Sequence, residues 1–254
     1  MLLNYKKYGE NGTPVFILHG IFGMLDNWHN IAKELSLNHV VYTIDARNHG
    51  QSPHCDEMSF QLMAEDLITL ANSLNISQFI LVGHSMGGKT AMWAAHQFEN
   101  HLLKLIVVDI APKTYKAGHL PYFEALKSIN WSELETRKDI DEALQKYESN
   151  MAVRLFLAKN IERNADGKFE LKCNIKAIEN AYQEVVSGLA FNHEMNLESL
   201  FISGANSNYL LEEDKENILN YFPNAQFKIV SNAGHWVHAE NSKEFLAKLS
   251  AFID

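Results

Sequence analysis

The stretch Gly83-His84-Ser85-Met86-Gly87 stands directly after the apolar run Phe79–Val82 and directly before a segment of helical period that starts at Gly88. A strand, a sharp turn and a helix in this order form a nucleophile elbow, which projects the serine hydroxyl above the edge of a sheet. Glycine on either side of the serine leaves room for so tight a turn. The stretch therefore predicts Ser85 as a nucleophile at a helix N-terminus, where the helix dipole favours negative charge.

Short apolar runs rich in Val, Ile, Leu and Phe alternate along the chain with segments of helical period. Such runs are typical of parallel strands covered on both faces, and their alternation with helices indicates βαβ units. The expected strands are Val15–Leu18, Val40–Ile44, Phe79–Val82, Leu105–Val108, Leu200–Ile202 and Phe227–Val230, and the expected helices include Trp28–Leu37, Phe60–Leu74, Thr90–Phe98 and Lys243–Phe252. The fold class is therefore α/β, with a mostly parallel central sheet flanked by helices.

This rhythm breaks between Pro112 and Asn196, where helical stretches and one turn signal at Asp166-Gly167 occur without a clear strand pair. We expect residues 1–111 and 197–254 to form the core of a single domain and residues 112–196 to form a mostly helical lid inserted into it. Aromatic side chains of this segment could roof an apolar pocket or pack the lid's own helices, and the sequence leaves both open. They are Phe123, Trp131, Tyr147, Phe156 and Tyr182.

Composition excludes several classes of function. The formal net charge of the 254 residues is −9, from 31 acidic and 22 basic side chains, and such a surface repels nucleic acid and anionic membranes. No apolar run has the length of a membrane span or a signal peptide. Cys55 and Cys173 lie far apart and outside any CxxC pattern, which predicts two reduced thiols instead of a disulfide or a zinc site. We expect a soluble cytoplasmic protein, and the sequence implies no particular oligomeric state.

A candidate general base follows the last expected strand, in Asn232-Ala233-Gly234-His235-Trp236. A serine hydroxyl is a poor nucleophile unless a neighbouring imidazole accepts its proton. His235 stands at a strand end, as this role requires, whereas His84 lies within the elbow and His238 lies inside the start of the following helix. We therefore predict His235 as the base, with His238 as the alternative.

The loop His19-Gly20-Ile21-Phe22-Gly23 follows the expected strand Val15–Leu18 and should face the serine. Two preoriented N–H groups stabilise the oxyanion of a tetrahedral intermediate. We expect these donors to be the backbone N–H groups of Met86 and Ile21, with Phe22 as the alternative to Ile21. The side chains of Phe22 and Trp236 are expected to contact the substrate, and His19 is expected to be structural.

A further polar stretch, Asp45 to Ser52, closes the strand Val40–Ile44. Asp45 and Arg47 could form a local ion pair that braces the turn, and Gly50 could take a backbone angle that other residues resist. We interpret this stretch as a structural turn with solvated charges.

The acid that orients the histidine is less obvious. After the expected strand Leu200–Ile202 the chain offers amides and a hydroxyl in Gly204-Ala205-Asn206-Ser207-Asn208, and the nearest acids, Glu212, Glu213 and Asp214, lie further on. An amide cannot stabilise a forming imidazolium as a carboxylate does. The strand Leu105–Val108 instead ends at Asp109, on the carboxyl edge of the sheet beside the elbow strand. We therefore predict Asp109 as the acid, although it could merely cap the turn that follows.

The motifs HGIFG, DARNHGQSPH, GHSMGGKTAM, VVDIAP and NAGHWVHAE together resemble those of the YbfF-type esterases, a branch of the α/β-hydrolases. The resemblance covers nearly the whole chain, including a stretch of the expected lid around residues 159–174. It implies the α/β-hydrolase fold and the hydrolysis of small acyl esters, with acyl-CoA thioesters as further candidate substrates. It implies an acid after the earlier strand, where Asp109 stands, and no cofactor or metal.

Two other functions stay open at this point. A lyase or carbon–carbon hydrolase can use the same serine triad, because fold and triad do not fix the bond that breaks. A non-catalytic scaffold of this fold usually lacks a triad member, whereas serine, histidine and acids are all present here. An aspartate-nucleophile hydrolase is excluded because Ser85 occupies the elbow.

Overall fold

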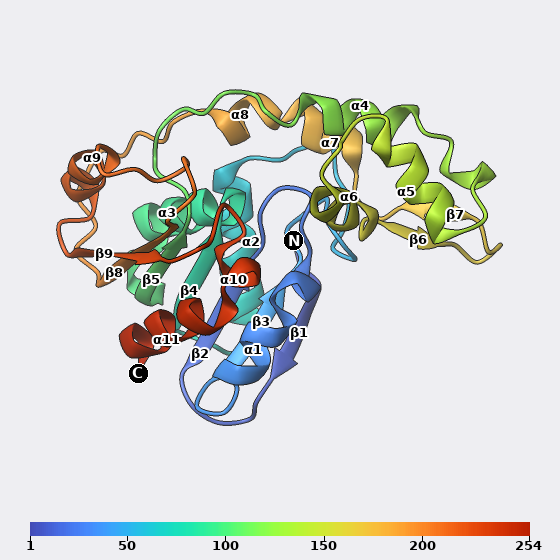
Figure 1. Ribbon diagram of the computed structural model, residues 1–254. Coiled ribbons are helices and arrows are strands. Elements are labelled where there is room, and N and C mark those ends of the chain that lie inside the picture. The colour runs from blue at the N-terminus through green and yellow to red at the C-terminus, as the bar shows by residue number, and fades with distance from the viewer.

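A seven-stranded sheet forms the centre of the protein, whose computed structural model describes all residues from 1 to 254 (Figure 1). Its strands are β1 (Tyr5–Tyr8), β2 (Pro14–Leu18), β3 (Val40–Ile44), β4 (Phe79–His84), β5 (Leu102–Val108), β8 (Ser199–Gly204) and β9 (Ala225–Val230). They lie in the order β1-β3-β2-β4-β5-β8-β9, and every neighbouring pair is parallel except β1 with β3. The α/β-hydrolase topology expected from the sequence is confirmed, with β4 near the centre of the sheet.

Helices connect the strands and cover both faces of the sheet. The core helices are α1 (His29–Leu35), α2 (Phe60–Ser73), α3 (Met86–Phe98), α9 (Asp214–Tyr221), α10 (Val237–Glu240) and α11 (Ser242–Ile253), with short 3₁₀ turns at Leu25–Trp28 and Glu99–His101. The segment between β5 and β8 contains α4 (Leu120–Ser128), a 3₁₀ turn at Trp131–Glu133, α5 (Arg137–Gln145), α6 (Met151–Ala158), β6 (Ile161–Arg163), β7 (Phe169–Leu171), α7 (Ile175–Asn180) and α8 (Tyr182–Val186).

Alternating side chains of the strands supply two cores. Val15 and Ile17 of β2 pack in one buried cluster with residues of α1 and α11, whereas Phe16 and Leu18 pack in the other with residues of α2 and α3. Because successive side chains of a strand point to opposite faces, both faces of β2 must be apolar. The all-apolar runs in the sequence are therefore explained by burial on both sides, and they fix β4 and β5 beneath the site described below.

Four strands differ from the expectation. β1 escaped detection because its sequence, Tyr-Lys-Lys-Tyr, is that of an exposed edge strand. β9 is also an edge strand and is not covered on both faces, since its residues alternate in exposure and Ile229 is 53% exposed. The expectation of no strand pair in residues 112–196 is wrong, because β6 and β7 pair antiparallel around a turn in which Gly167 has a φ of +76°. Strands of three residues are too short to show a period.

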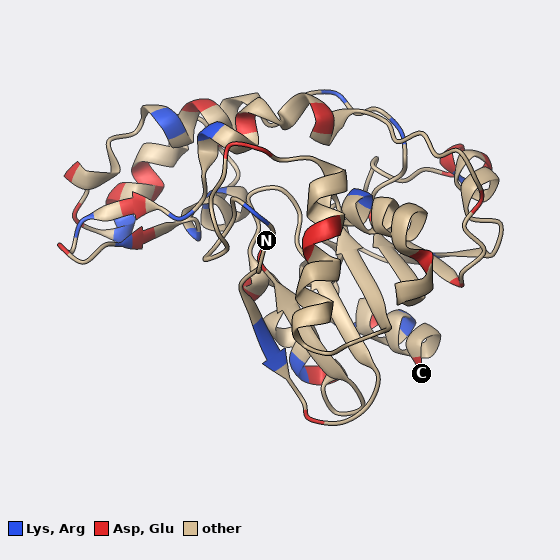
Figure 2. Cartoon of the chain, turned by 180° about the vertical axis from the view of Figure 1, so that it is seen from behind, with Lys and Arg blue, Asp and Glu red and all other residues tan.

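Residues 112–196, called the inserted segment from here on, lie across the end of the sheet at which the parallel strands finish (Figure 1). Seen from behind, acidic and basic residues are interspersed along this segment (Figure 2). Its buried apolar residues, by contrast, belong to the same cluster as the core residues of α2 and α3. The segment therefore packs as part of one continuous core. None of the helices in the protein has both the length and the apolarity to cross a membrane.

Candidate active site

Ser85 occupies a strained turn between β4 and α3. Its φ of +53° and ψ of −117° are values that side-chain-bearing residues rarely adopt, and its N–H donates to the carbonyl of Val108 at 3.1 Å. A Cβ at Gly83 would lie 2.1 Å from the carbonyl oxygen of Gly87, and a Cβ at Gly87 would lie 2.6 Å from that of His19. Both glycines are thus required by close backbone approach, and the turn presents the serine at the edge of the sheet.

His235 and Asp109 meet at the same edge, although 126 positions separate them in the chain. The Nδ1 atom of His235 lies 2.8 Å from Oδ2 of Asp109. The carboxylate also accepts hydrogen bonds from the backbone N–H of Gly204 at 3.1 Å and from the hydroxyl of Ser207 at 2.5 Å. Asp109 itself has a φ of +52°, so its main chain is held in an unusual conformation that aims the side chain sideways from β5 toward β8.

This pair sets the tautomer of the imidazole. A carboxylate accepts the proton on Nδ1, which leaves the lone pair on Nε2 free to accept a proton. Burial lowers the pKa of His235 below its ordinary value, so the ring is neutral at neutral pH. Burial raises the pKa of Asp109, while the hydrogen bonds from Ser207 and Gly204 act in the opposite direction. The arrangement therefore provides a neutral imidazole that is oriented by a buried acid.

Ser85 and His235 line one pocket of about 600 Å³ between the sheet edge and the inserted segment. The core contributes the loop from His19 to Gly23, the elbow, Tyr209 and the turn from His235 to Glu240. The inserted segment contributes Gly118, His119, Tyr122, Ala152, Val153, Leu155, Phe156, Leu157 and Lys159. Its volume lies within the range of small-molecule sites, and the apolar side chains concentrate on α6.

Two contacts hold His235 in place besides the one with Asp109. The ring of Tyr209 stacks on the imidazole, with centroids 3.7 Å apart and planes 19° apart. The Nε2–H of His84 donates to the backbone carbonyl of His235 at 2.8 Å. Burial and the nearby His235 ring lower the pKa of His84 well below its ordinary value, so His84 acts here as a neutral donor. Both the ring and the main chain of His235 are thereby positioned.

The residues expected around the serine lie as follows. Met86 is the first residue of α3, so its N–H has no partner within the helix. Ile21, Phe22 and Trp236 all line the pocket. Phe22 has a φ of +58°, and its carbonyl accepts a hydrogen bond from the Nδ2 atom of the buried Asn160 at 2.7 Å. This bond ties the inserted segment to the loop that faces the serine.

The alternative base and acids lie elsewhere. His238 is buried and stacks on Trp28, with ring centroids 4.0 Å apart, and neither of its ring nitrogens forms a hydrogen bond. Glu212 pairs with Lys215 at 2.5 Å, and Asp214 pairs with Lys113 at 2.5 Å. None of these acids contacts His235.

His19 has backbone partners on both ring nitrogens. Its Nδ1 lies 2.8 Å from the carbonyl oxygen of Gly20, and its Nε2 accepts from the N–H of Ala46 at 3.0 Å. The ring therefore braces the loop that carries Ile21, which is a structural role.

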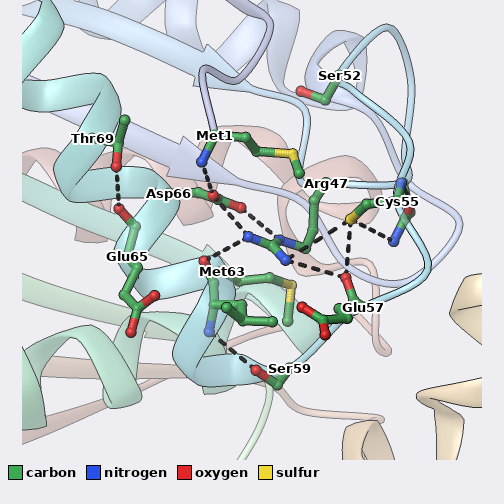
Figure 3. A network of polar contacts seen from close by, with 12 residues as sticks. Met1, Arg47, Ser52, Cys55, Glu57, Ser59, Met63, Glu65, Asp66 and Thr69 are labelled. Carbon is green, nitrogen blue, oxygen red and sulfur yellow. Dashed lines mark hydrogen bonds and ion pairs between the residues drawn. The ribbon is translucent and has the colours of Figure 1, made fainter.

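The expected local ion pair between Asp45 and Arg47 is wrong. Arg47 reaches α2 and binds Asp66 through two hydrogen bonds of 2.7 and 2.9 Å, and the N-terminal amine of Met1 contacts the same carboxylate (Figure 3). Asp45 instead accepts backbone N–H groups of Leu25 and Gln51. Both charges are buried and not solvated, because each has several fixed partners. The turn does require Gly50, whose φ is +55° and whose Cβ would meet the Asp45 carboxylate.

The aromatic side chains of the inserted segment divide between two surroundings. Phe156 lines the pocket and packs on Trp236, with ring centroids 5.5 Å apart. Phe123 packs between Phe22 and Tyr182, and the indole of Trp131 donates to a carbonyl inside the segment. Of the five aromatic residues that the sequence singled out, only Phe156 lines the pocket, and Tyr122, which was not singled out, also does.

Sequence reasoning missed the partners that surround the His235 and Asp109 pair. Ser207 and Tyr209 follow β8, where residues 205–209 include no carboxylate. A hydroxyl at a strand end beside the predicted acid is the signal that could have identified Ser207. His119, Tyr122 and Lys159 come from the inserted segment, whose path the sequence does not reveal. No cluster of His, Cys, Asp or Glu in the structure is arranged to hold a metal ion.

Comparison with known proteins gives matches along nearly the whole chain. The family model of the alpha/beta hydrolase fold matches residues 13–242. Esterase YbfF of Escherichia coli is 32% identical, over 96% of this chain and 94% of its own length. The sn-1-specific diacylglycerol lipase of Danio rerio is 33% identical, over 99% of this chain and 82% of its own length. The structure of an esterase from a marine microorganism superposes with a TM-score of 0.97 at 43% identity, covering 99% of both chains.

Proposed function

Because the chain belongs to the α/β-hydrolase family, in its YbfF-type esterase branch, we propose that it is a serine esterase with Ser85 as nucleophile, His235 as general base and Asp109 as the orienting acid. One observation carries the proposal. The only buried carboxylate within hydrogen-bond distance of His235 Nδ1 is Asp109, and Ser85 and His235 line the same pocket. Nucleophile, base and orienting acid are the three parts that acyl transfer needs.

The reaction follows from these roles. The Ser85 hydroxyl attacks the carbonyl carbon of the ester and loses its proton to Nε2 of His235, while Asp109 stabilises the imidazolium. The negative charge that forms on the former carbonyl oxygen is stabilised by N–H groups of Met86 and Ile21, or of Phe22 in place of Ile21. When the intermediate collapses, the bond to the leaving group breaks and His235 donates its proton to the departing oxygen or sulfur.

An acyl-enzyme remains on Ser85, and water then attacks it with His235 again as the base. Release of the carboxylic acid restores the free serine. No step requires a metal or a cofactor. Small acyl esters are the proposed substrates, and acyl-CoA thioesters are a further class, because the same steps cleave a thioester when sulfur replaces the leaving oxygen.

In this proposal the inserted segment acts as a lid that supplies the wall of the acyl pocket. Support comes from Leu155, Phe156 and Leu157 of α6, which line the pocket opposite the core. Phe22 and Trp236 bound the same space and would contact the substrate. A cytoplasmic location is proposed as well, supported by Cys55 and Cys173, which are both free thiols.

A panel of 4-nitrophenyl esters of increasing chain length, assayed beside acyl-CoA thioesters, tests the proposed activity. Wild-type protein should hydrolyse short esters and should be labelled by a fluorophosphonate probe at Ser85. The Ser85→Ala variant should be folded, unlabelled and reduced to less than about a thousandth of wild-type activity, because catalysis without a triad member is only ~10³–10⁴-fold above water. Folded wild-type protein that the probe leaves unlabelled would favour a scaffold instead.

A further inference from the structure

The wall of the pocket contains a single cation and a single carboxylate. Among the lining residues, Lys159 and Glu240 are the only ones of the Lys, Arg, Asp and Glu types. Burial lowers the pKa of each of the five lining histidines, so none of them adds a positive charge at neutral pH. The charge that a substrate meets in this pocket is therefore set by Lys159 and Glu240.

Glu240 is already engaged. Its two carboxylate oxygens accept the backbone N–H groups of Gly234 at 2.8 Å and of Trp236 at 3.1 Å. These bonds brace the turn that presents His235, since they hold the residues on either side of it. Glu240 therefore serves the main chain of this turn.

Lys159, by contrast, has no partner. Its ammonium forms no ion pair and no hydrogen bond within the protein, and the residue is exposed. Its main chain is nevertheless fixed, because its N–H closes the last turn of α6 on Phe156 and because the next residue, Asn160, binds the carbonyl of Phe22. Lys159 is thus an unpaired cation at the pocket whose main chain is held in place.

The position of Lys159 relative to the apolar wall follows from helix geometry. Ala152, Leu155 and Phe156 line the pocket, and Lys159 follows them at the spacing that keeps residues on one face of a helix. Four residues of helix rise by about 6 Å, so the backbone of Lys159 lies about one turn beyond that of Leu155. An apolar chain and an anion could therefore contact the same face of α6 in sequence.

This end of the pocket adjoins the turn that carries His235. Phe156 packs on Trp236, the residue that follows His235. The pKa of His238, three residues after His235, is lowered mainly by burial and to a smaller extent by nearby charges that include Lys159. In ester cleavage the leaving group receives its proton from the general base, so it must lie on the side of that residue. Phe156 thus lies near the end of the apolar wall on α6, and Lys159, about one turn beyond it, faces the leaving group more than the acyl chain.

We infer that Lys159 binds an anionic group, a carboxylate or a phosphate, carried by the leaving group of the substrate. The inference rests on the proposed esterase function and deepens it by naming the chemical class of the leaving group. Lys159 is then a specificity-determining residue, which favours leaving groups that carry a carboxylate or a phosphate over uncharged ones.

Three esters that share a butyryl group test the inference: methyl 4-butyryloxybenzoate, 4-butyryloxybenzoate and 4-butyryloxyphenyl phosphate. The first has a neutral leaving group, and the other two carry a carboxylate and a phosphate. Wild-type protein should show a higher kcat/KM for at least one anionic ester than for the neutral methyl ester. The ratio of kcat/KM for an anionic ester to that for the neutral ester is compared between the carboxylate and the phosphate, and the larger ratio identifies the preferred anion. In Lys159→Met the anionic-to-neutral ratio of kcat/KM should fall about two- to fivefold, as expected for the loss of an exposed charge pair.

Further variants sharpen the outcome. Lys159→Glu should lower the ratio below that of Lys159→Met, Lys159→Arg should retain most of it, and added salt should reduce it in wild-type protein. Lys172→Met is the matched control, because Lys172 pairs with Glu162 outside the pocket and its loss should leave the ratio unchanged. The pair of 4-nitrophenyl butyrate and mono(4-nitrophenyl) succinate places the carboxylate on the acyl side. For this pair the ratio of kcat/KM should change less when Lys159 is substituted.

Equal ratios in wild-type protein and Lys159→Met would overturn the inference while the hydrolysis of neutral esters still supports the proposed function. A ratio that changes for the succinate pair alone would overturn the assignment to the leaving group. Folded wild-type protein that cleaves none of the esters would count against the proposed function itself, and the inference would fall with it.

Discussion

The imidazole of His84 donates its Nε2–H to the backbone carbonyl of His235 across 2.8 Å, so the residue before the candidate nucleophile holds the main chain of the candidate base. The two rings lie 4.6 Å apart. Elbow and histidine turn are thereby coupled directly, without passing through the side chains that would carry out the chemistry.

Replacing His84 by alanine should lower kcat about three- to tenfold with a smaller change in KM, since one net hydrogen bond of about 1 kcal/mol is lost. His84→Gln should recover part of the loss, because its amide N–H reaches a position similar to Nε2. A proton NMR spectrum of the Nδ1–H of His235 provides a second readout, which should broaden or shift in the alanine variant. An unchanged kcat together with an unchanged resonance would contradict the positioning role.

The acid assignment predicts a graded series. Asp109→Asn should keep the fold and reduce turnover by up to ~10⁴-fold, because it presents the wrong partner to the imidazole. Ser207→Ala removes one hydrogen bond to the carboxylate and should cost only about tenfold. Glu212→Gln is the control, since Glu212 is exposed and pairs with Lys215, and it should retain wild-type activity. An active Asp109→Asn beside an inactive Glu212→Gln would reverse the assignment.

The pocket wall on α6 predicts chain-length selectivity. Phe156→Ala removes a half-buried ring that contacts Trp236, and about 1 kcal/mol of apolar contact with a long acyl chain should be lost. The ratio of kcat/KM for octanoyl to acetyl esters should therefore fall about fivefold. Met151→Ala, on the same helix but outside the pocket, should leave this ratio unchanged. Equal effects of the two substitutions would indicate that helix stability, and not pocket contact, is responsible.

Lys89 predicts a pH-dependent stability. It is fully buried without a carboxylate, and its ammonium donates to the carbonyls of Val185 at 3.1 Å and Ser187 at 2.5 Å, at the end of α8. Burial lowers the pKa of Lys89 from 10.5 to about 8. Between these values the unfolded chain binds the proton more tightly than the folded one, so the stability contributed by this residue rises as pH rises.

Urea unfolding of wild type and of a Lys89→Met variant should reveal this pH dependence of stability. The free energy of unfolding of wild type relative to Lys89→Met should increase by about 2 kcal/mol from about pH 7 to about pH 9.5. Lys33→Met, an exposed substitution on α1, should show no such trend. A pH-independent difference for Lys89→Met would show that the buried ammonium does not titrate in this range.

The sequence was sufficient for the parts of the fold that local chemistry dictates. Six strands could be predicted because each is a short run dominated by apolar residues, and the turn at Ser85 could be predicted because Gly83 and Gly87 leave room for it. Asp109 could be proposed because strand order places the ends of β4 and β5 side by side. Each of these inferences depends on residues close together in the chain or on a rule of sheet topology.

What the sequence could not supply are contacts between distant segments. Arg47 pairs with Asp66 on α2 and not with the nearby Asp45. Its buried guanidinium needs a carboxylate partner, and the residues of the turn itself do not indicate that this partner lies on α2. Ser207 and Tyr209 gain their places only when β8 lies beside β5. The division of the aromatic residues between pocket and interior depends on how α4, α6 and α7 pack, which their periodicity leaves undetermined.

The origin of the pocket's two sides has a consequence for how such a protein diversifies. Ser85, Asp109 and His235 come from the ends of β4, β5 and β9, whereas the facing wall comes from one uninterrupted stretch of chain between β5 and β8. Exchange of that stretch by recombination would replace the facing wall and leave the candidate nucleophile, base and acid unchanged. Substrate preference can therefore change quickly during evolution while the candidate catalytic residues stay the same.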